Sequence, residues 1–343
     1  MLYLKQIYPE DRKMTPYENI KNIVAKTVPS MRWDGVEPIA DWQAGAREKL
    51  ASLIGLDRML PAEKQLEIEY DRDSGDFREI RFRYQTEPGY FVPCHMCIPK
   101  GAKLPLPTFI CMQGHSKGMH ITLGRTKYPD EEVSGDRDFA IRCVKEGFIA
   151  IALEQRDFGE CGGNEKGPQC LEPSLTNLLV GRTTIGERVW DVMRLVDLLL
   201  DDLPEFAKAD SIYVLGNSGG GTCSVYSAAL DTRLAGGVPS CAVSSFAASI
   251  GAMHHCACNY VPGILNFFDM SELIAMTAPR KLVVVSGALD NIFPLKEAKE
   301  MVAIGAKAYE AYGEPGNLAH VIGGEGHRFY ADIAWEALER MGV

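Results

Sequence analysis

From residue 105 onward, the chain alternates short, mostly apolar stretches with longer stretches of helical periodicity. The apolar stretches are expected to be strands, and they cover 108–112, 148–153, 212–215, 237–243, 282–286 and 319–322. The helical stretches are expected at 137–146, 184–200, 220–230, 295–312 and 329–341. Continuous apolar strands separated by helices are typical of a mostly parallel sheet with helices on both faces. The sequence therefore predicts an α/β fold, in which ligands bind beyond the carboxyl ends of the strands.

The first hundred residues follow a different pattern. Residues 41–56 place apolar side chains on one helical face, whereas residues 80–84 alternate apolar and basic side chains, as an antiparallel strand with one solvated face does. The segment 91–99 is able to pair with that strand. We expect residues 1–100 to form a helical arm and antiparallel strands, packed on a core of residues 101–343 in one structural domain overall.

Composition limits the partners of the chain. It has 46 acidic and 36 basic residues, which gives a net charge of −10. A surface of that sign repels phosphate backbones and anionic lipid, so neither nucleic acid nor a membrane is an expected partner. Residues 1–22 have charges every few positions and no apolar core, which argues against an export signal. The ten cysteines are then expected to be reduced thiols in the cytoplasm.

One turn in the second part of the chain has the sequence of a nucleophile site. The stretch 212–215 leads into Gly216-Asn217-Ser218-Gly219-Gly220-Gly221 and then into a predicted helix, which is the strand–turn–helix context of G-x-S-x-G. So sharp a turn strains the backbone of the serine and requires almost no side chain two residues before and two after it. Gly216 and Gly220 meet that requirement. Ser218 is therefore the predicted nucleophile, with a glycine-rich phosphate-binding turn as the alternative.

A serine hydroxyl becomes a nucleophile when a base takes its proton and an acid orients that base. After this kind of turn, the partners follow along the chain in the order serine, acid, histidine. Asp290 and His327 each lie in the loop that follows a predicted strand, so we predict them as the acid and the base. His320 lies within a strand and is expected to be structural. The competing acids are Asp269 and Glu272.

Such a reaction also needs backbone N–H groups that hold the negative charge of the tetrahedral intermediate. One should come from Gly219, the residue after the nucleophile. The other should come from the loop after 108–112, which reads Gln113-Gly114-His115-Ser116. By its position in this loop, the amide of His115 is the expected second donor.

Several segments of the chain resemble those of a known protein family. They lie at 113–115, 155–159, 189–191, 216–221, 238–241, 255–262, 278–280 and 326–330. On these residues the chain resembles the α/β-hydrolases over roughly residues 40–343, and more narrowly their acetyl-xylan-esterase-like or dienelactone-hydrolase-like bacterial branch. The resemblance implies hydrolysis of carboxylic esters, with Ser218, Asp290 and His327 matching the family's triad. True dienelactone hydrolases have a cysteine where this chain has Ser218, and many hydrolases have a histidine where it has Gln113.

Some other residues are of types that bind metals, but they do not have the spacing of a metal site. The run His254-His255-Cys256-x-Cys258, with Cys241 upstream, lacks the separated C-x₂₋₄-C pairs of zinc sites, so we expect neither a metal nor a disulfide there. We expect the segment 253–268 to wall the substrate pocket instead, with His255 and Tyr260 binding substrate. Nucleotide-binding motifs are absent from the sequence, so no cofactor is expected. A structural ion-pair and packing set beneath the site is expected from Arg156, Asp157, Trp190 and Asp191.

The sequence therefore predicts a serine carboxylesterase that hydrolyses short-chain, chiefly acetyl, esters of small molecules or oligosaccharides through an acyl-serine intermediate. A peptidase or amidase of the prolyl-oligopeptidase type is the alternative enzyme, although the first ~100 residues are too few for its β-propeller. A non-catalytic binding protein on the same fold is the alternative outside the enzymes. The oligomeric state stays open, because residues 1–40 could dock on a neighbouring subunit of a homo-oligomer or on their own domain.

Overall fold

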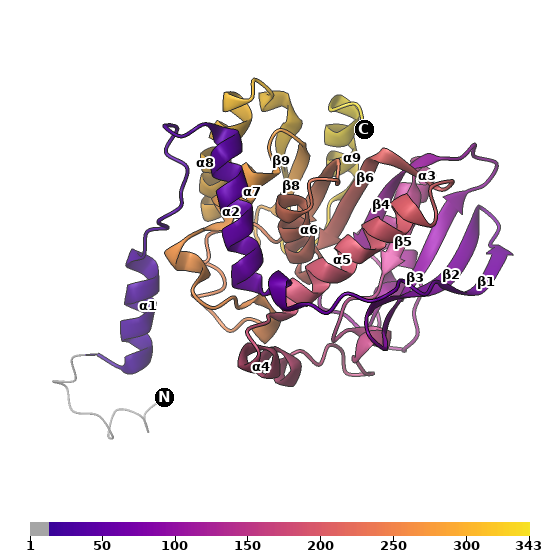
Figure 1. Ribbon diagram of the computed structural model, residues 1–343, viewed down its shortest axis with the longest axis horizontal. Coiled ribbons are helices and arrows are strands. Elements are labelled where there is room, and N and C mark those ends of the chain that lie inside the picture. The colour runs from indigo at the N-terminus through magenta and orange to yellow at the C-terminus, as the bar shows by residue number, and fades with distance from the viewer. Residues whose placement is uncertain (1–13) are drawn as a thin grey trace.

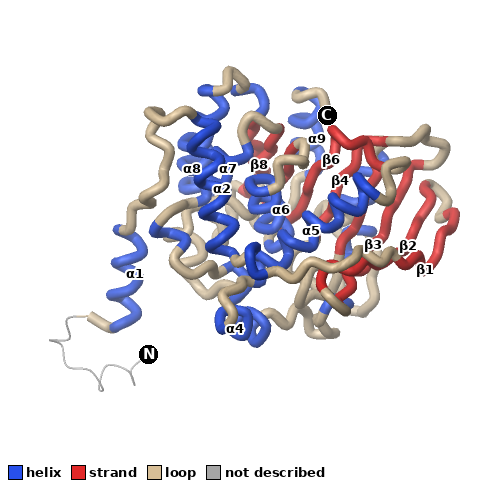
Figure 2. Tube along the Cα trace, viewed as in Figure 1, coloured by secondary structure: helices blue, strands red, loops and turns tan. Residues whose placement is uncertain are grey.

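The computed structural model describes residues 14–343 and places nine strands in one sheet (Figures 1 and 2), in the order β1-β2-β3-β5-β4-β6-β7-β8-β9. Strands β3 and β5 pair antiparallel, as do β1 with β2 and β2 with β3, while all pairs from β5 to β9 are parallel. The strands are β1 (Glu67–Asp73), β2 (Phe77–Glu87), β3 (Tyr90–Pro99), β4 (Leu106–Met112), β5 (Ile149–Leu153), β6 (Ala207–Asn217), β7 (Gly236–Ser240), β8 (Lys281–Gly287) and β9 (Leu318–Gly323). The mostly parallel sheet is the predicted one.

Helices cover both faces of this sheet. The described helices are α1 (Pro16–Lys26), α2 (Ile39–Ile54), α3 (Phe139–Lys145), α4 (Leu171–Leu179), α5 (Thr184–Asp201), α6 (Gly219–Leu230), α7 (Met270–Thr277), α8 (Leu295–Ala311) and α9 (Ala331–Arg340). One hydrophobic cluster joins α2, α5, α6, α7 and α8 to one face, and a second joins α3 and α9 to the other. The strands separate these clusters by alternation, since Ile110 of β4 belongs to the first cluster and Phe109 to the second.

The predicted strand 237–243 is too long, because β7 ends at Ser240. The backbone turns at Cys241, which has a φ of 46° and donates its N–H to the carbonyl of Val285 at 2.8 Å. A non-glycine residue with positive φ cannot continue a strand, so the chain leaves the sheet here. The carbonyl of Ser240 is thereby left to accept a hydrogen bond from the N–H of Ser218, at 2.8 Å.

Ahead of the first strand, the chain reaches the core through α2 and the segment before it. Trp42, Ala46 and Leu50 of α2 are buried in the cluster that also contains α5 and α6. Before α2, the N–H groups of Ser30 and Met31 donate to the carbonyls of Asn266 and Phe267. Helix α1 has no buried residue, and in Figure 1 it lies beside the body of the molecule. Residues 1–13, part of the arm on which the export and docking expectations rest, lie outside the described residues.

The parallel register brings the predicted functional loops to one edge of the sheet. Strands β4, β6, β7, β8 and β9 are consecutive parallel neighbours, so their carboxyl ends lie side by side. The loops that leave β4, β6, β8 and β9 contain His115, Ser218, Asp290 and His327 in turn. Among the helices of residues 14–343, none is both long and apolar enough to cross a bilayer.

Candidate active site

Ser218 occupies a sharp turn between β6 and α6. Its backbone has φ 55° and ψ −118°, a conformation that costs a residue with a side chain of order 1–3 kcal/mol. The glycines around it allow the turn, because a Cβ on Gly220 would overlap the carbonyl oxygen of Met112 in β4, and one on Gly216 would overlap the carbonyl of Gly220. Helix α6 can therefore lie directly against the end of the sheet. The strand–turn–helix geometry predicted for residues 212–230 is present here.

Asp290 and His327 form a hydrogen-bonded pair. The Nδ1 of His327 lies 2.8 Å from Oδ2 of Asp290, whose side chain is completely buried. The other carboxylate oxygen, Oδ1, accepts the backbone N–H groups of Ile292 at 2.8 Å and Phe293 at 3.0 Å. The ring of Phe293 stacks on the imidazole with centroids 5.9 Å apart. Because the carboxylate accepts from Nδ1–H, the tautomer that it favours leaves Nε2 free to accept a proton.

The environment of Asp290 favours its charged form. Burial alone would raise the pKa of the carboxyl group. The hydrogen bond with His327 and the two backbone N–H groups outweigh burial, so that the pKa lies below its ordinary value. The competing acids are engaged elsewhere: Asp269 caps the N-terminus of α7, and Glu272 accepts from Arg32 and closes the same capping box.

Ser218 and His327 line one cavity of about 380 Å³, together with Gly114, His115 and Gly219. The backbone of the β4 loop comes close to Ser218, since a Cβ on Gly114 would lie 3.2 Å from Cβ of Ser218. In the same way, a Cβ on Gly219 would lie 2.8 Å from Nδ1 of His115. The two residues predicted to supply the oxyanion N–H groups therefore lie against each other beside Ser218.

Of the two residues predicted to bind substrate, one lines the cavity of Ser218 and the other does not. His255 lines the cavity of Ser218, with its Nε2 3.2 Å from Oγ of Ser249, and burial lowers its pKa. Tyr260 does not line that cavity. It lies along a neighbouring one of about 580 Å³ beside α4, and its hydroxyl donates to the carbonyl of Ile250. His254, His255 and Cys256 line both cavities and form the wall between them.

Comparison with known proteins agrees with this geometry. No family model matches the chain. One curated protein of Bacillus subtilis (strain 168), named "Putative hydrolase YtaP", is 25% identical over 263 residues, which cover 74% of this chain and 82% of that protein. Solved structures match over almost the whole chain at lower identity, and such matches bear on the fold.

Three of these structures are named as carbohydrate esterases. A "putative acetyl xylan esterase" from Bacteroides fragilis NCTC 9343 superposes with a TM-score of 0.75 at 18% identity, covering 92% of this chain and 84% of that chain. A glucuronoyl esterase from Solibacter usitatus has a TM-score of 0.66 at 15% identity, covering 92% and 99%. One from Teredinibacter turnerae T7901 has a TM-score of 0.65 at 18% identity, covering 93% and 90%. The protein has the α/β-hydrolase fold.

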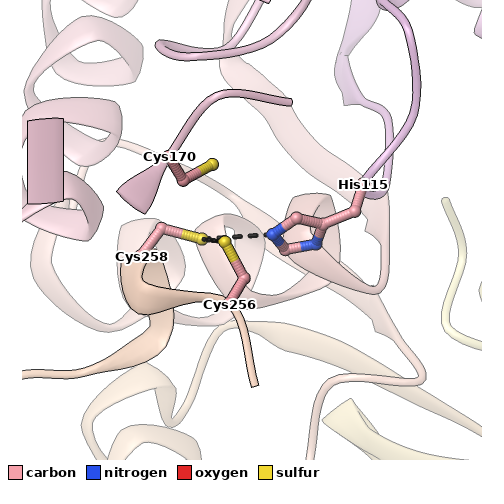
Figure 3. A group of neighbouring side chains, drawn as sticks. All are labelled: His115, Cys170, Cys256 and Cys258. Atoms are coloured by element: carbon pink, nitrogen blue, oxygen red, sulfur yellow. Dashed lines mark hydrogen bonds between the residues drawn. The ribbon is translucent and has the colours of Figure 1, made fainter. Parts of the chain in front are cut away.

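A group that the sequence did not predict lies behind the β4 loop of this hydrolase fold. His115, Cys170, Cys256 and Cys258 bring one ring nitrogen and three sulfur atoms within 4.8 Å of one another (Figure 3). We call these four residues the thiol cluster. Cys170 precedes α4, in a segment from which no metal ligand was predicted, so the run at 254–258 showed only part of the group.

A second group of residue types able to bind a metal contains Cys241, Asp290 and His327. Two of its members are the hydrogen-bonded acid and base described above. The third, Cys241, has its thiol 3.2 Å from the carbonyl oxygen of Arg328. This group is therefore accounted for by the acid–base pair and its surroundings.

The buried carboxyl group of Glu154 holds the loop after β4 by hydrogen bonds. Glu154, which follows β5, accepts from Nε2 of Gln113 at 2.5 Å and from the backbone N–H of Met119 at 3.0 Å. The side chain of Gln155 donates to the carbonyl of Gln113 at 2.6 Å. Burial raises the pKa of Glu154 to about 7, because these hydrogen bonds only partly offset the loss of water. Gln113 thus acts here as a link between the loop and β5.

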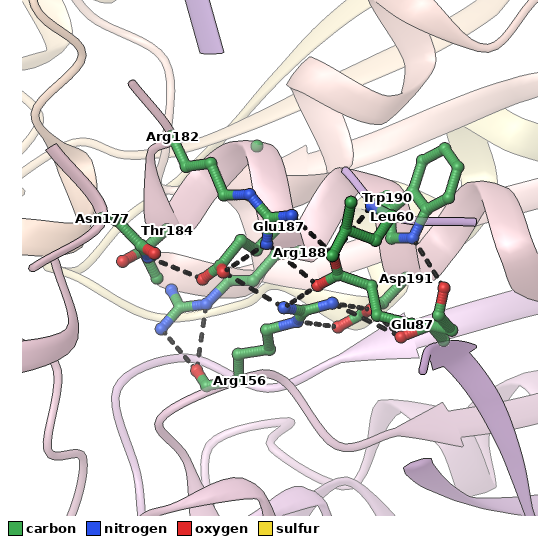
Figure 4. Close-up of polar contacts among 12 residues, drawn as sticks. Leu60, Glu87, Arg156, Asn177, Arg182, Thr184, Glu187, Arg188, Trp190 and Asp191 are labelled. Atoms are coloured by element: carbon green, nitrogen blue, oxygen red, sulfur yellow. Dashed lines mark hydrogen bonds and ion pairs between the residues drawn. The ribbon is translucent and has the colours of Figure 1, made fainter. Parts of the chain in front are cut away.

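The predicted ion-pair set surrounds Arg156 (Figure 4). Its guanidinium donates to both carboxylate oxygens of Asp191 and to Glu87, each at 2.8 Å, and lies 3.1 Å from Glu187. These partners belong to α5 and to the end of β2, so the network joins the N-terminal strands to the core. Trp190 donates from its ring to the carbonyl of Thr86. Asp157 does not pair with Arg156; its Oδ2 lies 4.0 Å from the guanidinium of Arg188.

Proposed function

We propose that this protein is a serine carboxylesterase that hydrolyses short-chain, chiefly acetyl, esters of small molecules or oligosaccharides. The observation that supports it most directly is the cavity into which the strained Ser218 and the Asp290-bound His327 both open. The names of the structural relatives, acetyl xylan esterase and glucuronoyl esterase, add support for esters on sugars. We also propose that the reaction takes place in the cytoplasm.

In the proposed reaction, Oγ of Ser218 attacks the ester carbonyl while Nε2 of His327 accepts the hydroxyl proton. The carbonyl oxygen becomes an oxyanion, held by the N–H groups of Gly219 and His115. The C–O bond then breaks, the alcohol leaves with the proton from His327, and the acyl group stays on Ser218. Water attacks this acyl-serine by the same route, which releases the acid and restores the serine.

The charge of Asp290 has a definite part in this cycle. When His327 takes the proton, the imidazolium lies 2.8 Å from a carboxylate that stays ionised. Its positive charge is therefore formed next to a fixed negative charge in a buried place, where the attraction is stronger than in water. The same hydrogen bond prevents the ring from turning, so that Nε2 stays directed into the cavity.

The test compares p-nitrophenyl acetate, butyrate and octanoate as substrates of the wild-type protein and of Ser218→Ala. We expect acetate to be preferred and turnover to fall by roughly 10⁴–10⁶ in the variant, as when the nucleophile of a triad is removed. Ser211→Ala is the matched control, because Ser211 lies in the same strand β6 and far from the elbow along the chain.

A fluorophosphonate label separates the remaining outcomes, since only an activated serine reacts with it. Labelling of the wild type without ester turnover would show that the serine is activated and that the proposed substrates are wrong. If the wild type shows neither labelling nor ester turnover, the proposed enzymatic function is wrong and the protein is a binding protein.

A further inference from the structure

Three separate segments bring the thiol cluster together beside the active site. His115 comes from the loop after β4, Cys170 precedes α4, and Cys256 and Cys258 flank Ala257 in a turn beyond β7. Figure 3 shows the three sulfur atoms and the ring of His115 converging on one point. The Sγ of Cys258 lies 3.2 Å from Nε2 of His115 and 3.3 Å from Sγ of Cys256.

We propose that His115, Cys170, Cys256 and Cys258 bind one Zn²⁺ ion in a tetrahedral Cys₃His site. Zinc is about 2.3 Å from thiolate sulfur and about 2.0 Å from imidazole nitrogen, which puts tetrahedral ligand atoms roughly 3.5–3.8 Å apart. The distances in the cluster, from 3.2 Å up to the limit of 4.8 Å, bracket those values. Thiolate and imidazole are the ligands that zinc prefers in proteins.

The buried cation next to the cluster fits the charge of such a site. Three thiolates around Zn²⁺ leave one negative charge, which must be compensated in a buried place. The guanidinium of Arg188 is fully buried, and its Nη2 lies 3.4 Å from Sγ of Cys170. The carboxylate of Asp157, at 4.0 Å, is beyond hydrogen-bonding distance from it. An N–H donor to a zinc-bound sulfur is a common second layer around such sites.

The ligand spacing explains why the sequence argued against a metal. Cys256 and Cys258 are separated by one residue, and the other two ligands come from distant parts of the chain. Among the four proposed ligands, no two cysteines have the C-x₂₋₄-C spacing by which zinc sites are recognised. The fold brings Cys170, in the segment after Arg156, against the turn beyond β7 and so completes the set of four ligands.

The proposed ion is structural and not a reactant, because four protein ligands fill a tetrahedral zinc site. It would affect catalysis through His115, whose side chain would be fixed to the ion while its backbone N–H faces the oxyanion. Cys256, another ligand, lines the catalytic cavity. Zinc would therefore tie the oxyanion loop to the cavity wall. This catalytic consequence rests on the proposed esterase function, whereas zinc binding itself does not.

The first experiment measures metal content. The full-length reduced chain, expressed with added zinc and desalted, should contain one Zn²⁺ per chain by elemental analysis, and Cys170→Ser and Cys256→Ser should each lose most of it. Cys143→Ala is the matched control, because Cys143 is a buried thiol of α3 with no part in the cluster, and it should keep the zinc. Zinc absent from the wild type, or unchanged in both serine variants, would overturn the proposal.

A second measurement does not depend on the variants folding. Wild-type protein loaded with Co²⁺ in place of Zn²⁺ should show intense tetrahedral d–d bands and thiolate-to-cobalt charge-transfer absorption, both lost when zinc is added. A spectrum of octahedral cobalt would contradict the site. Thiol titration of the unreduced, denatured protein tests the rival disulfide; a thiol pair missing there, with no zinc uptake after reduction, would also overturn the proposal.

The catalytic consequence has its own test, chosen so that its failure differs from that of the esterase function. Cys170 does not line the catalytic cavity, so Cys170→Ser should lower kcat for p-nitrophenyl acetate about 10-fold or more while KM changes little, because a displaced oxyanion donor acts in the transition state. Fluorophosphonate labelling should persist. Zinc loss with unchanged kcat would overturn the link to catalysis, and an inactive, unlabelled wild type would instead refute the esterase.

Discussion

The carboxylate of Asp290 is fully engaged by its three hydrogen bonds, to His327, Ile292 and Phe293. We predict that Asp290→Asn leaves the fold intact and lowers kcat of the proposed esterase by about 10⁴, the loss seen when an amide stabilises the wrong histidine tautomer in a serine protease. Steady-state kinetics with p-nitrophenyl acetate checks this prediction.

The rival acid offers a matched control for that experiment. Asp269 caps α7 through Oδ1, and asparagine is an equally good cap, so Asp269→Asn should keep both stability and activity. If Asp269→Asn lost activity while Asp290→Asn kept it, the assignment of the acid would be reversed.

At the residue scale, the sequence was sufficient to predict where residues that directly follow strands lie in the fold. Parallel strands place their carboxyl ends together, so the positions of Ser218, Asp290 and His327 after three strands predicted that they would meet. Cys170 could not be found in this way. It precedes a short helix, and its distance from Cys256 depends on how two loops fold over the sheet, which no local pattern in the sequence shows.

The contact between α6 and β4 leaves no room for a side chain at Gly220. We predict that Gly220→Ala lowers the free energy of unfolding by roughly 2–4 kcal/mol or prevents folding, because the methyl group would be forced into the Met112 carbonyl. Gly45→Ala is the control. Gly45 also lies in a helix, α2, but has open space around it, so alanine should stabilise by about 0.5–1 kcal/mol. Chemical denaturation of both variants measures the difference, and equal effects would contradict the argument.

The loop after β4 is held by the carboxyl group of Glu154, whose pKa is raised from an ordinary 4.5 to about 7. Between these pH values the folded chain holds a proton that the unfolded chain has released, so stability should fall as the pH rises through this window. The loss approaches about 3 kcal/mol, since one pKa unit corresponds to about 1.36 kcal/mol. We predict that Glu154→Gln removes this contribution. The checking measurement is the free energy of unfolding at pH 5 and pH 8, and an unchanged difference in the variant would refute it.

Elements with clear periodicity were predicted to within a few residues, as for α5 and β8. The sequence predicted no range for three of the described helices, α1, α4 and α7, and the last two lack a single apolar face. All eight residues of α7 are buried, so its pattern does not alternate with helical period. Helix α4 is the reverse case, because Ser174 is its one buried residue and several leucines are exposed. A pattern of one apolar face predicts helices that lie on a core, and neither of these does so in the usual way.

Across the whole molecule, the network around Arg156 connects β2, the loop after β5 and α5. We predict that Arg156→Met lowers the free energy of unfolding by about 3–5 kcal/mol, since Asp191 would be left as a buried acid without its cation, while Glu87 and Glu187 would keep only Arg182. Arg78→Met is the control. Its ion pair with Asp71 lies at the exposed edge of the sheet and should be worth less than about 1 kcal/mol. Urea unfolding of both variants provides the comparison. Similar losses in the free energy of unfolding would show that the network stabilises the fold no more than an exposed ion pair does.

The backbone of Ser218 has a consequence for heat resistance and for selection. Glycine adopts φ 55° and ψ −118° without the steric penalty that serine bears, at a smaller entropic cost of about 0.5–1 kcal/mol. Ser218→Gly should therefore melt at a higher temperature than the wild type while being catalytically dead, and a lower melting temperature in a thermal scan would refute this. A lineage that kept this fold only as a scaffold would gain stability by replacing this serine with glycine. If the proposed esterase is correct, the serine in this chain is kept for its chemistry at the expense of stability.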